Sequence, residues 1–251
     1  ERAVDPAVNE SLYDQALTHA RAAESLARER GDRLAELHAL TLQARVHLSQ
    51  HQERAAVTQL SPALESIADL PISRETVEAQ AELGRALMMG GSQEEAVAWC
   101  DRALAASNLA DDRLLTDILI TKGSALTNLG RRIEGEILLL GAMQMAERNG
   151  DTWAALRARN NALGVVSAED LAAAAEMISD GYAIAMRHGL TTWAHQFAHS
   201  GLIHEFERGN YDATSLQLVG VGGAVTSASV KDRLLRLLPH VVIADVPGSA
   251  P

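Results

Sequence analysis

The chain has 251 residues, of which 47% are hydrophobic and only 3% aromatic, and 22 Lys and Arg residues stand against 33 Asp and Glu residues for a net charge of −11. A core built mainly from alanine and leucine favours closely packed helices over a β-sandwich. The acidic balance argues against binding to nucleic acid or to anionic lipid, because both need a basic protein face.

Neither a disulfide framework nor a membrane span is predicted. Cys100 is the single cysteine, so no intramolecular disulfide can form, and a reducing, cytoplasmic setting is expected. The sequence has no run of 18 apolar residues and no recognisable signal peptide. Because it begins with Glu1 rather than methionine, we expect it to be a piece of a longer protein.

The first predicted helix begins at Asp5-Pro6, an N-cap followed by the proline that is favoured at the first helical position. It ends near Gly31, and a pair of helices is expected over about 33–69. Pro62 lies inside the second helix of this pair. Its missing N–H predicts a kink or a restart of the helix at this point.

The stretch 72–107 shows the repeating unit most clearly. Gly90-Gly91 ends a first helix, and Ser92 opens a second one with Glu95 three residues on, which is the pattern of a capping box. The first helix carries an apolar stripe with helical spacing, at Leu83, Leu87 and Met88. Two antiparallel helices joined by a tight turn are therefore expected.

Further helix pairs are expected at about 111–149, 152–188 and 191–219, and a last helix at about 225–238. Trp153 and Trp193 stand near the starts of two successive first helices and are expected to connect neighbouring repeats. Glycines at 220, 222 and 223 indicate a flexible end of the array rather than a phosphate loop, because no Lys-Ser/Thr follows them. We expect one repeat domain over residues 1–240 and a flexible tail over 241–251.

Small residues recur at one place in the first helix of each pair. Taking positions 44, 84, 123, 164 and 201 as anchors gives steps of 40, 39, 41 and 37 residues, with Leu163 as an alternative anchor in the fourth pair. A second small residue follows twelve positions later in most pairs, as in Gly84 with Ala96 and Gly123 with Gly135. A regular period near 40 residues is typical of a helical solenoid.

The spacing of Leu83-Gly84, Ala96 and Ala103 resembles that of a tetratricopeptide (TPR) repeat. With its long period, its Asn160-Asn161 pair before Ala-Leu-Gly, and its stretch 130–151, the chain resembles the C-terminal TPR arrays of LuxR-type and cyclase-linked bacterial signalling ATPases. The resemblance covers about residues 8–215. It implies an all-α, right-handed superhelical solenoid of antiparallel helix pairs that binds partners on its concave face.

The resemblance also implies which side chains face the groove, namely those six and three residues before each anchor and one, four and five after it. The candidates are His38, Arg45, Arg85, Met88, Met89, Asp117, Asn128, Asn161 and His195. If Leu163 is the fourth anchor, Arg157 and Asn160 take the corresponding positions. For each single residue, a solvated face without a partner is the alternative interpretation.

No catalytic or metal site is predicted. His195 and His199 are four residues apart on one helix, but the segment lacks the His-Glu-x-x-His order of a zinc hydrolase, and surface histidines are the favoured interpretation. Cys100 falls at a core-facing position with no activating partner, which predicts an inert thiol. Neither a metal nor a cofactor is expected.

The sequence therefore predicts a non-enzymatic module that binds a protein, a peptide or a small effector in its groove. We expect it to be the sensor or interaction arm of a larger bacterial signalling or transcriptional regulator with an attached nucleotide-binding or cyclase domain. The alternative is a free-standing TPR scaffold that assembles other proteins. The incomplete repeats at both ends also leave a homodimer open.

Overall fold

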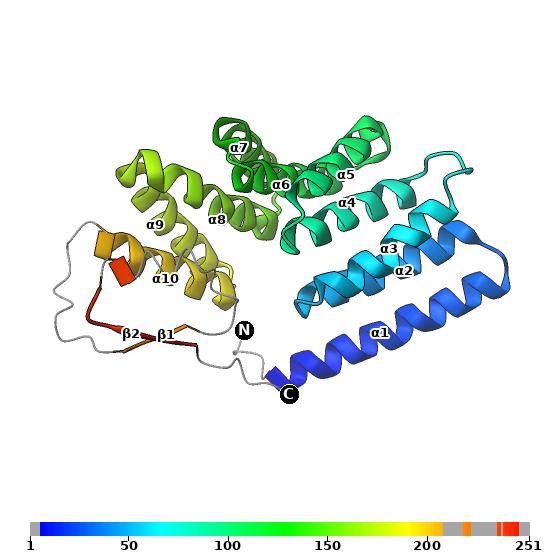
Figure 1. Ribbon diagram of the computed structural model, residues 1–251, viewed down its shortest axis with the longest axis horizontal. Coiled ribbons are helices and arrows are strands. Elements are labelled where there is room, and N and C mark those ends of the chain that lie inside the picture. Colours follow the sequence, from blue (N-terminus) through cyan, green and yellow to red (C-terminus); the bar gives the residue numbers. More distant parts are fainter. Residues whose placement is uncertain (1–5, 208–217, 222–234, 237, 246–251) are drawn as a thin grey trace.

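A computed structural model describes residues 6–207, 218–221, 235–236 and 238–245. Within these ranges the chain forms ten α-helices that follow an arc (Figure 1). Their bounds are α1 Pro6–Glu29, α2 Arg33–Ser49, α3 Glu53–Ser66, α4 Arg74–Met89, α5 Gln93–Ala105, α6 Asp112–Asn128, α7 Arg132–Arg148, α8 Thr152–Glu169, α9 Leu171–Arg187 and α10 Thr191–Glu207. A short 3-10 helix, η1 (Ser107–Leu109), precedes α6.

The helices are arranged in two layers. Helices α2, α4, α6, α8 and α10 form the inner layer, in which each helix contacts the next one of the series. Helices α5 and α7 stand on the outer side of the arc (Figure 1), and each outer helix packs against the inner helices before and after it. The predicted all-α solenoid of helix pairs with a period near 40 residues is thereby confirmed.

Aspartate side chains fix the start of most of the inner helices. Asp32, Asp111 and Asp151 each accept a hydrogen bond from a backbone N–H three residues on, at 2.9–3.0 Å, and begin α2, α6 and α8. The capping box predicted at Ser92 is wrong: Ser92 is the N-cap of α5 but makes no side-chain cap bond. A capping box forms instead at the start of α4, where the Ser73 hydroxyl accepts from the backbone N–H of Thr76 and the Thr76 hydroxyl accepts from that of Ser73.

The restart predicted at Pro62 is also absent, because α3 continues through this residue to Ser66; the alternative, a kink, stays a prediction. Proline removes the hydrogen bond that its N–H would donate to the carbonyl of Thr58, four residues earlier. Thr58 and Pro62 are both exposed. Water can therefore bind the carbonyl of Thr58, which the proline leaves without a partner. The helix thus tolerates a proline on this exposed face.

The predicted anchors mark the places where paired helices approach most closely. Ala44, Ala56 and Ala96 are fully buried, and a Cβ built on Gly84 would lie 3.1 Å from the Sγ of Cys100 on α5. In the fourth pair Leu163 is buried, whereas Gly164 is exposed with no atom within 4 Å of a Cβ built on it. Leu163 is therefore the anchor of that pair, and the alternative register applies.

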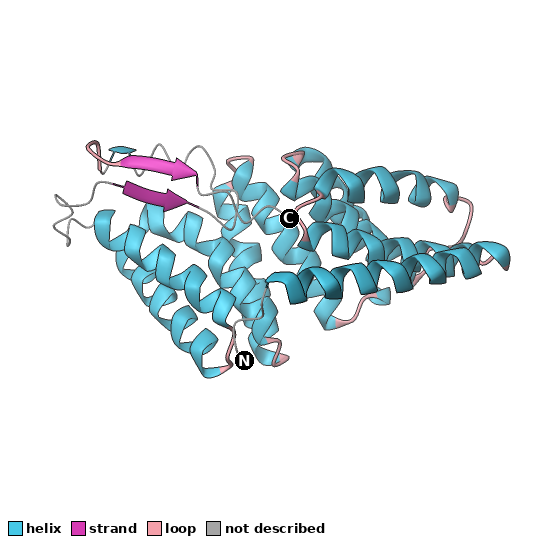
Figure 2. Cartoon of the chain, turned by 90° about the horizontal axis from the view of Figure 1, so that it is seen from below, coloured by secondary structure: helices cyan, strands magenta, loops and turns pink. Residues whose placement is uncertain are grey.

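Two short strands near the C-terminal end were not predicted. β1 (Leu218–Val221) pairs in parallel with β2 (Val242–Asp245), and Leu218 lies opposite Val242 (Figure 2). The end of a helix and a flexible glycine at 220 were expected where β1 lies, and a flexible tail was expected where β2 lies. Valine, leucine and isoleucine make up three of the four residues of β1 and two of the four of β2, and such residues favour paired strands. The predicted helices over 211–217 and 225–234 lie outside the described residues, and the division into one domain and a tail stays a prediction.

Candidate functional site

A groove of about 360 Å³ lies on the inner helices α2, α4, α6 and α8. Charged side chains dominate its lining, and the two signs are balanced. The arginines are Arg45, Arg74, Arg85, Arg113 and Arg157, and the carboxylates are Glu78, Glu82, Asp111, Asp117 and Asp151. Ser49, Leu114, Trp153 and Ala154 complete the lining.

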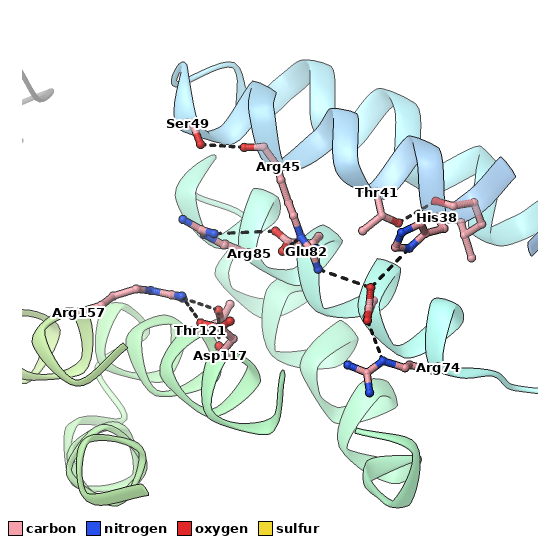
Figure 3. A network of polar contacts seen from close by, with 12 residues as sticks. His38, Thr41, Arg45, Ser49, Arg74, Glu82, Arg85, Asp117, Thr121 and Arg157 are labelled. Atoms are coloured by element: carbon pink, nitrogen blue, oxygen red, sulfur yellow. Dashed lines mark hydrogen bonds and ion pairs between the residues drawn. The ribbon is translucent and has the colours of Figure 1, made fainter. Parts of the chain in front are cut away.

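Helices α2 and α4 are joined by ion pairs at one end of the groove (Figure 3). The Nε of Arg45 donates to Oε1 of Glu82 at 2.7 Å, and a second nitrogen of Arg45 lies 3.7 Å from Glu78. The Nδ1 of His38 also lies 3.7 Å from Glu78. Both glutamate side chains are only 13% exposed, so α2 brings the Arg45 guanidinium and the His38 ring to carboxylates that α4 holds away from water.

A second row of contacts follows the beginnings of the inner helices. Arg74 on α4 donates to Glu78 at 3.0 Å and also to Asp111, the residue that caps α6. Arg113 on α6 lies 3.7 Å from Asp151, which caps α8. Each of these arginines therefore pairs with the N-cap of the next inner helix. The row continues with Trp153 and Trp193, whose ring centroids are 5.5 Å apart, so the predicted contact between successive repeats is confirmed.

Arg157 on α8 is the most buried charged group of the groove, with its side chain only 8% exposed. It donates to Asp117 at 2.7 Å and to the hydroxyl of Thr121 at 3.0 Å, both on α6 (Figure 3). Burial lowers the pKa of Arg157 to about 10, and burial likewise raises the pKa of Asp117. Desolvation thus acts against both charges, and their mutual attraction offsets this penalty.

The structure brings four of the predicted groove residues into this network, namely His38, Arg45, Arg85 and Asp117. The other five lie apart from it. The amide of Asn161 donates to Ser124 on α6 at 2.8 Å, a contact outside the groove lining. Met88 and Met89 are half-buried against the core, Asn128 is exposed at the end of α6, and His195 is exposed on α10 outside the groove lining. Binding by any of the nine residues stays a prediction.

Several lining residues were not among the predicted candidates, although a sequence signal for them exists. Arg33, Arg74 and Arg113 recur at steps of 41 and 39 residues, and Trp153 and Trp193 continue the series at steps of 40. This is the period of the anchors. This repetition at the starts of the inner helices predicts that the three arginines occupy equivalent positions. It also predicts that tryptophan takes the same position in the last two repeats.

The histidine-rich helix α10 holds no metal cluster in the described part of the chain. His195 and His199 are exposed, whereas His204 is 4% exposed, so the three do not converge. Across residues 6–207 and the described C-terminal segments, no group of three potential His, Cys, Asp or Glu ligands occurs. The helices within the same ranges also include none that is long and apolar enough to cross a membrane.

Cys100 is fully buried between α4 and α5, and burial raises the pKa of its thiol to about 12 from 9.0. Such a shift reduces the thiolate fraction about a thousandfold at neutral pH. We expect no release of thionitrobenzoate when the folded protein meets Ellman's reagent, and one equivalent per chain in denaturant. Rapid labelling of the folded protein would contradict the assignment of Cys100 to the core.

No protein-family model and no curated protein matches this sequence. Solved structures of similar fold exist. A Rap protein complexed with competence and sporulation factor shares 19% identity at a TM-score of 0.68 over 92% of this chain and 62% of the Rap chain. A putative kinesin light chain of Podosopora anserina with nearly identical TPR-like repeats shares 15% identity at a TM-score of 0.56, over 81% of this chain and 93% of that one.

A single-residue variant of the same kinesin light chain repeats is similar at a TM-score of 0.51 and 16% identity, over 70% of this chain and 97% of that one. At these identities the likenesses concern the fold. The fold is that of a TPR-like helical solenoid, as the spacing of the anchors predicted. This chain spans less than two thirds of the length of the Rap chain. The narrower resemblance to LuxR-type and cyclase-linked arrays stays a prediction.

Proposed function

We propose that this chain is a non-enzymatic binding module whose groove holds an extended segment of a protein or peptide. The observation that carries the proposal is the lining of the groove, to which four successive inner helices and their N-caps contribute five arginines and five carboxylates. Packed helices stand about 8–10 Å apart, and an extended chain advances about 3.3 Å per residue. Each inner helix would therefore meet the partner at about every third residue, which suits an extended segment of roughly ten residues.

The similar fold of a Rap protein that was crystallised with competence and sporulation factor supports a binding role for a solenoid of this kind. We further propose that the module is the sensor or interaction arm of a larger bacterial signalling or transcriptional regulator, and that binding in the groove biases an attached nucleotide-binding or cyclase domain. A small effector is a second kind of occupant for the same groove. The buried Cys100 thiol suits the reducing cytoplasm in which such a regulator would work.

A selection from a displayed library of random dodecapeptides tests the proposal. Peptides that bind the wild type should lose at least about a hundredfold in affinity with the triple variant Arg45→Ala, Arg85→Ala, Asn161→Ala, because two guanidinium groups of the groove and the Asn161 side chain are removed together. Fluorescence anisotropy of labelled peptides gives the affinities, and circular dichroism verifies that the triple variant remains folded.

Arg148→Ala is the matched control, because Arg148 is exposed on the outer helix α7. It should bind the selected peptides as the wild type does. If the triple variant retains wild-type affinity while folded, the peptides bind elsewhere and the groove is not the binding site. An unproductive selection with a folded wild type would count against extended peptides as partners.

A further inference from the structure

Helix α1, at one end of the arc, has an apolar face that packs against α2 and a second one that is open to solvent (Figure 1). Leu17, Ala20 and Ala27 form the first face and are buried. The second face consists of five residues, all of them exposed: Leu12, Ala16, His19, Ala23 and Leu26. Its two leucines are 54% and 47% exposed. An exposed stripe of this length on one helix indicates a surface for a further contact.

The open stripe has the spacing of a coiled coil. Its residues follow one another at steps of four, three, four and three. Leu12, His19 and Leu26 therefore share one position of a heptad, which we call d, and Ala16 and Ala23 share the position a. A helix with an a and d stripe fits along the side of another α-helix, so the complementary surface is helical.

The face around the stripe has no formal charge over residues 11–28. Gln15 and Ala22 flank the stripe, whereas Asp14, Arg21 and Arg28 lie on the opposite side of the helix. The chain as a whole has a net charge of −11, so most surfaces of two copies repel each other. An uncharged face avoids this repulsion, and it offers no electrostatic attraction to a basic partner. The charge distribution thus favours a second copy of this chain as the occupant.

The sizes of the side chains favour an antiparallel arrangement of two such helices. When two helices pair antiparallel, each layer joins a d residue of one to an a residue of the other. Leu12 then lies opposite Ala23 of the second copy, and His19 lies opposite Ala16 of the second copy. Every such layer combines a large side chain with a small one, which fills the space evenly. A parallel pair would place alanine opposite alanine and leave gaps.

We propose that the open stripe of α1 is a dimer interface, packed antiparallel against the same stripe of a second copy about a two-fold axis. About 18 residues of each helix would take part, and burying three of the seven heptad positions removes roughly 1,000 Å² from water in total. This area is at the lower limit for a specific interface, so we expect a weak dimer with a dissociation constant on the order of 50 µM. No residue of α1 lines the groove, so the dimer does not depend on the proposed function.

Sedimentation equilibrium of the purified chain tests the proposal. The mean mass of the wild type should rise from monomer toward dimer between about 5 and 500 µM. Leu12→Glu should raise the dissociation constant at least about tenfold, because the dimer would remove an unpaired carboxylate from water. Leu12 is exposed in the single chain, so circular dichroism should show that this variant remains folded. A wild type that remains monomeric at the highest concentration would overturn the dimer.

Ile133→Glu is the matched control, because Ile133 is an apolar residue of α7 that is 70% exposed. It should dimerise as the wild type does. If Ile133→Glu dissociates the dimer and Leu12→Glu does not, the copies meet at the outer face of α7 and the assignment to α1 is wrong.

Two double variants test the orientation of the helices. In the antiparallel arrangement, Leu12→Glu combined with Ala23→Lys places opposite charges in the same layer, so the dissociation constant should return to within about threefold of the wild-type value. Leu12→Glu combined with Ala23→Glu places like charges there and should stay monomeric. A parallel pair would bring equal charges together in both variants. If the oppositely charged variant dimerises no better than the like-charged one, the antiparallel interface is overturned.

Discussion

Gly135→Ala should lower the free energy of unfolding by about 2–3 kcal/mol. A Cβ built on Gly135 would lie 2.7 Å from the backbone oxygen of Gly123 and 3.0 Å from the backbone nitrogen of Thr127, and it would also overlap the Thr127 hydroxyl. The Thr127 side chain could rotate away from the new methyl group, but the two backbone atoms are part of α6 and can move only with that helix. The methyl group can therefore be accommodated only if α6 and α7 move apart, which loosens the packing on both sides. Chemical denaturation followed by circular dichroism measures the loss.

Gly141→Ala on the same helix is the matched control and should have the opposite sign. A Cβ built on Gly141 has no atom within 4 Å, and the residue is exposed. Alanine in a helix interior is favoured over glycine by about 0.5–1 kcal/mol, so this variant should be slightly more stable than the wild type. Equal destabilisation by both variants would show that a general effect, rather than the contact with α6, is responsible.

The position of Gly135 was predictable because close approach of paired helices recurs along the chain. Gly84 with Ala96 and Gly123 with Gly135 keep the same twelve-residue separation, and each pair lies where two helices meet. Periodicity of this kind depends on backbone geometry, which the spacing of small residues records. The order of the helices, their pairing and their approximate ends follow from the same signal.

The composition of the groove was only partly predictable, because one inner-helix face both lines the groove and packs between repeats. The offsets that selected Arg45 and Arg85, which line the groove, also selected Met88 and Met89, which pack against the core. The ion pair of Arg157 with Asp117 joins residues 40 positions apart. It depends on the side-chain rotamers and on the curvature of the arc, and neither of these is recorded in the spacing of residues.

Sequence patterns within a few residues gave wrong or ambiguous predictions where the conformation depends on contacts with distant parts of the chain. Ser92 has the residue type of an N-cap and stands at that position of α5, but its hydroxyl makes no cap bond. The pairing of β1 with β2 joins segments more than twenty residues apart, for which no local pattern exists. In the fourth repeat the choice between Leu163 and Gly164 required the burial of each residue. This choice mattered, because the register of Leu163 places Arg157 in the groove.

Asp117→Ala should lower the free energy of unfolding by about 2–3 kcal/mol, because it leaves the buried guanidinium of Arg157 with only the neutral hydroxyl of Thr121. The full penalty for a broken buried pair is about 3–5 kcal/mol, and the 40% exposure of the Asp117 side chain argues for the lower figure. The matched control is Arg113→Ala. Arg113 is 81% exposed and 3.7 Å from its partner, so its loss should change stability by less than about 0.5 kcal/mol.

The complementary variant Arg157→Met leaves Asp117 as an unpaired carboxylate whose pKa burial already raises. A carboxyl group with a raised pKa binds more protons in the folded state than in the unfolded state, so stability falls as the pH rises through that range. Arg157→Met should therefore be markedly less stable than the wild type at neutral pH and should approach it as the pH falls. The double variant Asp117→Leu, Arg157→Met removes both charges and should recover most of the stability at neutral pH, because two apolar side chains replace a desolvated pair. A double variant as unstable as the sum of the single variants Asp117→Leu and Arg157→Met would show that the residues act independently and that the ion pair does not join α6 to α8.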